Sequence, residues 1–166
     1  IMSKRSFPNW YKLAEVALNI TPAQFKAMSF NDKEALARNT SITLETQRLF
    51  LKPEYWYQWQ YRFLAFSFLA GNPSLIPEIQ QLLFTEKHPV ILDTLAGNPS
   101  LIPQIQLLFF TEEYSDKNEV LKILFHNPSF LKGLTPKEMR EFTKTKEFRL
   151  PVYKKRLKQI RKKIKL

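Results

Sequence analysis

Residues 69–86 read LAGNPSLIPEIQQLLFTE, and residues 95–112 read LAGNPSLIPQIQLLFFTE. The two copies match at 15 of 18 positions and are offset by 26 residues. Self-similarity at a period of about 20 to 50 residues is typical of chains in which one structural unit is stacked on the next. Weaker copies begin at Leu36 and Leu124, so the repeated pattern extends beyond the matched pair on both sides.

The residues within each copy predict a helix, a turn and a second helix. Gly71 suits the C-terminal end of a helix, and Asn72 is pushed out of the helical region because Pro73 follows it. Pro77 suits the first turn of the next helix, where a missing N–H costs nothing. We expect 82–84, Leu-Leu-Phe, to be buried. Helices this short are unstable alone, so each must pack against its neighbours.

An asparagine recurs in the turn of every copy, as Asn39, Asn72, Asn98 and Asn127. The favoured interpretation is that these four amides bind the backbone of the turns, because Asn commonly stabilises turns in this way. The alternative is a row of asparagines that binds a ligand.

The pattern LAxNPxxxPExxxxL, followed by a short helix that starts at His88-Pro89-Val90, resembles the leucine-rich repeat variant family. The resemblance spans residues 36–130 and is closest over 69–110. It implies an all-α, right-handed α-solenoid of short helix pairs, with a period of about 26 residues, and loosely a binding role. It implies no reaction, since function belongs to sites rather than folds.

Two features of the chain depart from that family. Ile76 and Ile102 precede the helix-starting prolines, where the family usually has threonine. Some members also hold an iron–sulfur cluster through cysteines, whereas this chain has none. Without cysteine, disulfides, thiol catalysis and thiolate metal sites are excluded.

Charge divides the chain into two parts. Residues 1–131 contain 12 Lys and Arg and 12 Asp and Glu, whereas residues 132–166 contain 14 and 3, so the whole net charge of +11 lies in the second part. We predict a helical repeat domain over 1–131 and a basic C-terminal helical extension over 132–166, packed on the repeats or projecting from them. A field concentrated at one end favours an acidic partner.

The cationic residues of the extension are the candidate nucleic-acid-binding set. From Pro151 the chain predicts a helix with a narrow apolar stripe and dense positive charge on the remaining surface. Phosphate contacts need only such cations, and no base-reading motif is present. Alternatives are a solvated helix docked on the last repeat, an acidic protein partner, or an anionic membrane surface. The candidates are Lys137, Arg140, Lys144, Lys154, Lys155, Arg156, Lys158, Arg161, Lys162, Lys163 and Lys165.

The segment 53–68, PEYWYQWQYRFLAFSF, departs from the repeat and predicts one helix with aromatics on every face. One interpretation makes Trp59, Phe63 and Phe66 the core of an enlarged unit. The other makes part of the segment an exposed surface for a protein partner, since aromatics are strong anchors. The candidate partner-binding residues are Tyr55, Trp56, Tyr57 and Trp59.

Motifs for catalysis are missing from the sequence. There is no Walker loop, no dinucleotide-binding glycine motif, no metal-type histidine spacing and no nucleophile elbow. His88 and His126 are expected to be cap or surface residues. A glycosylase-like use of Trp59, Arg62 and Asp93 has no spacing argument behind it. We therefore predict a non-enzymatic protein without cofactor or metal.

Two further observations concern location. No apolar run reaches the roughly 18 to 20 residues that span a bilayer, and the N-terminal region has no signal-peptide pattern. We expect a cytoplasmic protein.

Three functions are predicted, in order of preference. The first is the binding of a polyanion, most of all DNA or RNA. The second is that of a protein adaptor that uses residues 55–68, and the third is peripheral association with a membrane.

Overall fold

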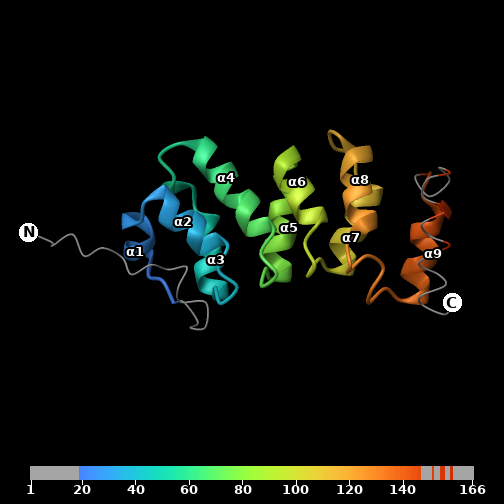
Figure 1. Ribbon diagram of the computed structural model, residues 1–166, viewed down its shortest axis with the longest axis horizontal. Helices are drawn as coiled ribbons and strands as arrows, with labels where there is room; N and C mark the ends of the chain where they lie inside the picture. Colours follow the sequence, from blue (N-terminus) through green and yellow to red (C-terminus); the bar gives the residue numbers. More distant parts are fainter. Residues whose placement is uncertain (1–18, 147–150, 152–153, 156–157, 159–166) are drawn as a thin grey trace, which may run out of the picture.

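The computed structural model describes residues 19–146 together with residues 151, 154, 155 and 158 (Figure 1). Within 19–146 the chain is all-α, as predicted, and this part contains no strand. A short 3₁₀ helix, η2 (Pro53–Tyr55), precedes the fourth α-helix. The α-helices are α1 (Pro22–Ala27), α2 (Phe30–Ala37), α3 (Leu44–Phe50), α4 (Trp59–Ala70), α5 (Pro77–Thr85), α6 (Pro89–Ala96), α7 (Pro103–Thr111), α8 (Lys117–His126) and α9 (Pro136–Lys144).

The helices follow one another along the long axis of the molecule, with α1 near one end and α9 near the other (Figure 1). Helices α2, α4, α6 and α8 each pack against the next in that order, and α3, α5 and α7 pack beside them. An asparagine turn joins α2 to α3, α4 to α5, and α6 to α7. Helix α9 follows the corresponding turn after α8.

The predicted starts of the helices are confirmed. Pro77, Pro103 and Pro136 each occupy the first turn of their helix. Thr135 forms a capping box with Glu138, in which its hydroxyl accepts from the Glu138 N–H at 3.2 Å. Such a cap pairs N–H groups that otherwise lack a partner inside the helix.

The four asparagines bind turn backbone, which confirms the favoured interpretation. The Asn98 amide donates to the carbonyls of Ala70 (2.6 Å) and Asn72 (2.9 Å), and its Oδ1 accepts from the Ser100 N–H at 2.8 Å. Asn72 and Asn127 make the equivalent contacts to the turns before theirs. The amides of Asn72, Asn98 and Asn127 therefore join their own turns to the preceding ones, and the Asn39 Oδ1 accepts from the Ser41 N–H of its own turn at 2.8 Å.

A second set of buried amides, which was not predicted from the sequence, repeats alongside the asparagines. The Gln80 amide donates to the carbonyls of Leu75 (3.1 Å) and Ser100 (2.9 Å), and its Oε1 accepts from the Ile102 N–H at 3.0 Å. Gln47 and Gln106 repeat this pattern. In the capping boxes of this chain a Glu or Gln three residues further on pairs the backbone N–H of the N-cap residue, whereas Gln80 of α5 does so for Ile102, and no side chain caps the first turn of α7.

Two expectations about buried residues need correction. Leu83 and Phe84 are buried, but Leu82 is 41% exposed because it lies on the outer side of α5. The segment 53–68 is not one helix, because residues between η2 and α4 are extended and α4 runs from Trp59 to Ala70. The break is fixed by packing: the Trp56 indole N–H donates to the Phe50 carbonyl at 2.9 Å.

Helix α9 adds apolar side chains to the same core as the other helices. Phe142 is fully buried, and its ring centroid lies 4.8 Å from that of Phe110 and 6.5 Å from that of Phe130. Edge-to-face ring pairs of this kind are favourable beyond the area they bury. The apolar side of α9 is thus held against α7 and the turn after α8, and its polar side faces outward.

Candidate functional site

The outward side of α9 presents three of the predicted nucleic-acid-binding residues. Lys137, Arg140 and Lys144 are three and four residues apart, a spacing that places them on one face of a helix, and all three are exposed. We call this set the α9 cationic face. The buried Phe142 on the other side of the helix fixes which way the face points.

Neighbouring carboxylates neutralise this face only in part. The Lys144 ammonium lies 2.8 Å from Glu141, and hydrogen bonding by Lys144 holds the pKa of that carboxyl below its usual range. Among the residues that the structure describes, neither Lys137 nor Arg140 forms an ion pair. Exposed ion pairs are weak, so the Lys144 pair gives way readily to a competing anion.

The rest of the predicted cationic set lies further along the chain. Lys154, Lys155 and Lys158 are exposed. The remaining candidates lie outside the described residues, as do the four residues of the predicted apolar stripe, which are Tyr153, Leu157, Ile160 and Ile164. Those remaining candidates are Arg156, Arg161, Lys162, Lys163 and Lys165.

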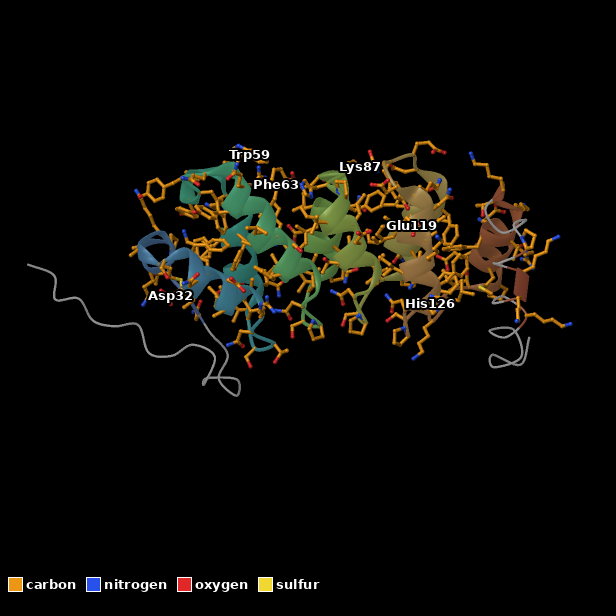
Figure 2. All side chains as sticks on the ribbon, turned by 45° about the horizontal axis from the view of Figure 1, so that its top comes forward. Asp32, Trp59, Phe63, Lys87, Glu119 and His126 are labelled. Carbon is orange, nitrogen blue, oxygen red and sulfur yellow. The ribbon has the colours of Figure 1, made fainter. Side chains whose placement is uncertain are left out.

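The predicted partner-binding aromatics separate into two pairs. Tyr57 is 92% exposed and Trp59 is 67% exposed, so the expectation that Trp59 belongs to the core is wrong. Trp59 lies one helical turn before Phe63 at the start of α4, with ring centroids 5.6 Å apart (Figure 2). Tyr55 and Trp56 are half-buried, and their rings lie 5.6 and 6.0 Å from that of Phe25.

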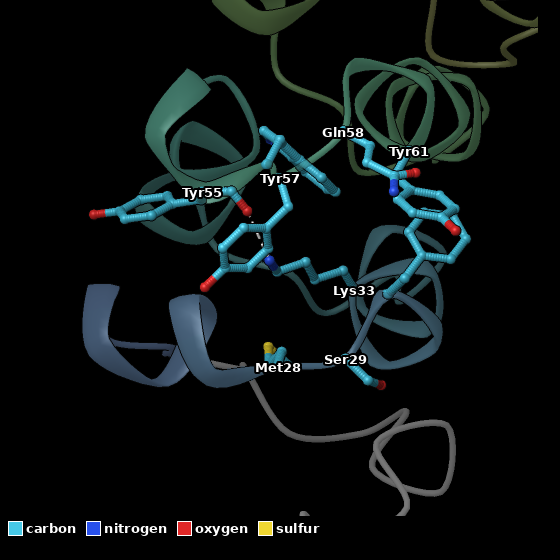
Figure 3. Close-up of a pocket in the computed structure, with 9 residues that line it drawn as sticks. Met28, Ser29, Lys33, Tyr55, Tyr57, Gln58 and Tyr61 are labelled. Atoms are coloured by element: carbon cyan, nitrogen blue, oxygen red, sulfur yellow. Dashed lines mark hydrogen bonds between the residues drawn. The ribbon is translucent and has the colours of Figure 1, made fainter.

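A pocket of about 300 Å³ lies where α2, η2 and the start of α4 meet (Figure 3). Most of its walls are aromatic, and one charged side chain, Lys33, reaches into it. Lys33 is only 4% exposed, because it shares the buried side of α2 with Leu36 and Ala37. The residues that line the pocket are Met28, Ser29, Phe30, Lys33, Tyr55, Trp56, Tyr57, Gln58 and Tyr61.

The Lys33 ammonium is held by a carbonyl and by ring faces rather than by a carboxylate. It donates to the Tyr55 carbonyl at 2.9 Å and lies 4.9 Å from the ring centroids of both Phe25 and Trp56. Burial lowers the pKa of Lys33 from its ordinary value. Lys33 is not among the residues predicted from the sequence, although it lies three and four residues before Leu36 and Ala37, a spacing that places it on the same side of a helix as these apolar residues.

The two histidines occupy separate places in the structure, His88 before α6 and His126 at the end of α8. The His88 ring stacks on Phe63 with centroids 4.5 Å apart, and His126 is exposed at the end of α8. Arg62 pairs with Glu86 at 2.9 Å, and burial is the main cause that raises the pKa of Asp93. In the described part of the chain, no group of three or more His, Asp or Glu residues is arranged to hold a metal ion.

Comparison with known proteins adds no further assignment. No known protein family, no curated protein and no solved structure matches this chain. The resemblance to the leucine-rich repeat variant family is therefore untested by relatives. Across the described residues, every helix is too short or too polar to cross a bilayer.

Proposed function

We propose that this chain is a non-enzymatic binding protein that holds a polyanion, nucleic acid first, through its basic C-terminal region. One observation carries the proposal: residues 1–131 are electrically neutral, residues 132–166 carry the full net charge of +11, and the described cations of that region are exposed. The chain's own carboxylates are too few there to neutralise them.

The scaffold in this proposal is a right-handed α-solenoid of the leucine-rich repeat variant kind, with a unit of about 26 residues. The end-to-end order of the helices and the recurring amide contacts between successive turns support it. In such a scaffold each unit contacts only its neighbours, and the outward side of α9 carries the exposed side chains of Lys137, Arg140 and Lys144. The cytoplasmic location remains a prediction.

The mode of binding follows from the kind of residue on the α9 cationic face. Lysine and arginine neutralise phosphates and release condensed counter-ions, which makes binding independent of sequence and strongly dependent on salt. Each neutralised phosphate contributes a slope of about −0.9 to a plot of log affinity against log salt concentration on duplex DNA. We therefore expect similar affinities for duplexes of unrelated sequence.

Fluorescence anisotropy with a labelled duplex and with single-stranded DNA and RNA tests the proposal on the full chain. The double variant Lys137→Glu/Arg140→Glu is expected to weaken binding about tenfold or more, because two phosphate contacts become repulsive. Lys26→Glu/Lys52→Glu is the matched control, since both lysines are exposed in the neutral part and the net charge changes equally.

Two results would contradict the proposal. One is an equal loss of affinity in the two double variants, which would mean that net charge alone acts. The other is the absence of binding at low salt, where electrostatic association is strongest. Flotation with vesicles that contain anionic lipid, run in parallel, identifies the membrane alternative.

A second candidate function is favoured by the exposed pair Tyr57 and Trp59. Large aromatics that lie free on a surface are typical anchors of protein interfaces. In this alternative the chain is an adaptor, and the double variant Tyr57→Ser/Trp59→Ser loses a stoichiometric protein partner. Val90→Ser, at another exposed apolar residue, is the control that keeps it.

A further inference from the structure

We propose that the pocket beside Lys33 binds a small molecule that combines a flat apolar body with one carboxylate. This site is separate from the α9 cationic face, because the pocket lies among α2, η2 and α4 while α9 lies at the other end of the molecule (Figure 1). The inference therefore does not depend on the proposed binding of nucleic acid.

The first argument is the unbalanced charge of Lys33. An ammonium carries three N–H donors, and one of them is used by the Tyr55 carbonyl at 2.9 Å. Among the described residues no carboxylate lies within ion-pair distance of Lys33. Asp32, its neighbour in the chain, instead accepts from the Ser29 hydroxyl at 2.8 Å.

Burial of a charge without a counter-ion is unfavourable unless other groups compensate for it. The rings of Phe25 and Trp56, each 4.9 Å from the ammonium, supply part of that compensation. A carboxylate in the pocket would supply the missing opposite charge and a charge-assisted hydrogen bond. A neutral ligand would leave the imbalance in place, which is why we assign an anionic one.

The second argument is the shape and the lining of the pocket. A volume of about 300 Å³ is at the lower end of the range of small-molecule sites, which are mostly apolar with a few polar groups. Figure 3 shows the Lys33 ammonium beside the Tyr55 carbonyl, and Tyr57, Gln58 and Tyr61 are among the other residues that line the pocket. Ring walls favour a flat body that stacks on them.

Two matched probes test the assignment on the full chain: 2-naphthoate and its neutral analogue 2-naphthalenemethanol. Titration by calorimetry is expected to give about tenfold tighter binding of the carboxylate, which is the gain expected for one charge-assisted hydrogen bond. Lys33→Met keeps the length of the side chain and removes the charge, so the preference for naphthoate should disappear. Lys26→Met, at an exposed lysine of α1, should leave the preference unchanged.

Tyr57→Ser provides a second variant that is independent of the buried lysine. Because Tyr57 is 92% exposed, its loss leaves the core intact, yet it removes one wall of the pocket. We expect binding of both probes to weaken about threefold to tenfold. The inference is overturned if the wild type binds neither probe, if it binds both equally, or if naphthoate binding is the same in the wild type, in Lys33→Met and in Tyr57→Ser.

Discussion

The two central turns and the two ends of the described chain use their polar side chains in different ways. In the turns at Asn72 and Asn98, the buried amides bind backbone of their own turn and of the preceding one. At the ends, no described carboxylate pairs with the buried Lys33, and Lys137 and Arg140 face outward without an ion pair to any described residue. Where the sequence repeats most strictly, its polar residues hold the stack together. Binding capacity is therefore to be sought where the repeat breaks down.

Asn98→Ala is the change that we expect to destabilise the central region most. The change leaves the buried carbonyl of Ala70 and the N–H of Ser100 without their partner, and it removes one of the two donors to the Asn72 carbonyl, which keeps the Leu75 N–H. An unpaired buried polar group costs about 1 to 3 kcal/mol, so we expect a loss of about 3 kcal/mol or more in the free energy of unfolding. Urea unfolding followed by circular dichroism measures it.

Asn118→Ala is the control for this variant, because Asn118 is exposed on α8. Its free energy of unfolding should stay within about 0.5 kcal/mol of the wild type, as is usual for surface changes. Equal stability of the two variants would contradict the role assigned to the asparagine contacts.

A change at the C-terminal end should alter the affinity for nucleic acid but not the stability of the stacked helices. In Lys137→Glu/Arg140→Glu we expect the slope of log affinity against log salt concentration to become shallower by about 2, one phosphate contact for each lost cation. The unfolding midpoint should be nearly unchanged, since both side chains are exposed. An unaltered slope would remove α9 from the proposed interface.

Thr135→Ala is a smaller change, which tests how much the cap at the start of α9 contributes to stability. Loss of the hydroxyl that accepts from the Glu138 N–H should cost about 1 kcal/mol. Thr40→Ala, at an exposed threonine in an earlier turn, is the control and should be close to neutral. Urea unfolding of both proteins compares the two threonines, and equal losses would argue against the cap.

The smallest expected effect is the pH dependence that Lys33 contributes. Its pKa is lowered on folding, so the unfolded chain holds this proton up to higher pH than the folded chain. The cost of burying the charge is therefore present in full below the folded-state pKa and falls as the pH rises towards 10.5. The difference in stability between Lys33→Met and the wild type should therefore change in favour of the wild type over that range, and a constant difference in urea unfolding would contradict the lowered pKa.

Local chemistry made the boundaries of the helices predictable. Proline at the start of a helix, threonine as a cap, and asparagine before proline each act within a few residues, so Pro77, Thr135 and Asn98 behave as the sequence indicates. The choice between the two interpretations of the asparagines was also correct, because an amide in a tight turn has backbone partners nearby.

Features that depend on contacts between helices could not be predicted in the same way. The exposure of Leu82, the break before Trp59 and the glutamine contacts all follow from which neighbour covers each side of a helix. Lys33 is the clearest case. Its burial depends on Tyr55 and Trp56, some 22 residues away in the chain, folding back over α2.

The two sets of buried amides point in opposite directions along the chain, so the central turns are bonded from both sides. The amides of Asn72, Asn98 and Asn127 reach back to carbonyls of the turn before theirs, whereas those of the glutamines reach forward to the following turn. During synthesis the N-terminal portion of a chain folds first, at about 5 to 20 residues per second. A newly emerging turn thus meets acceptors for its asparagine and a glutamine for its own backbone, both already in position.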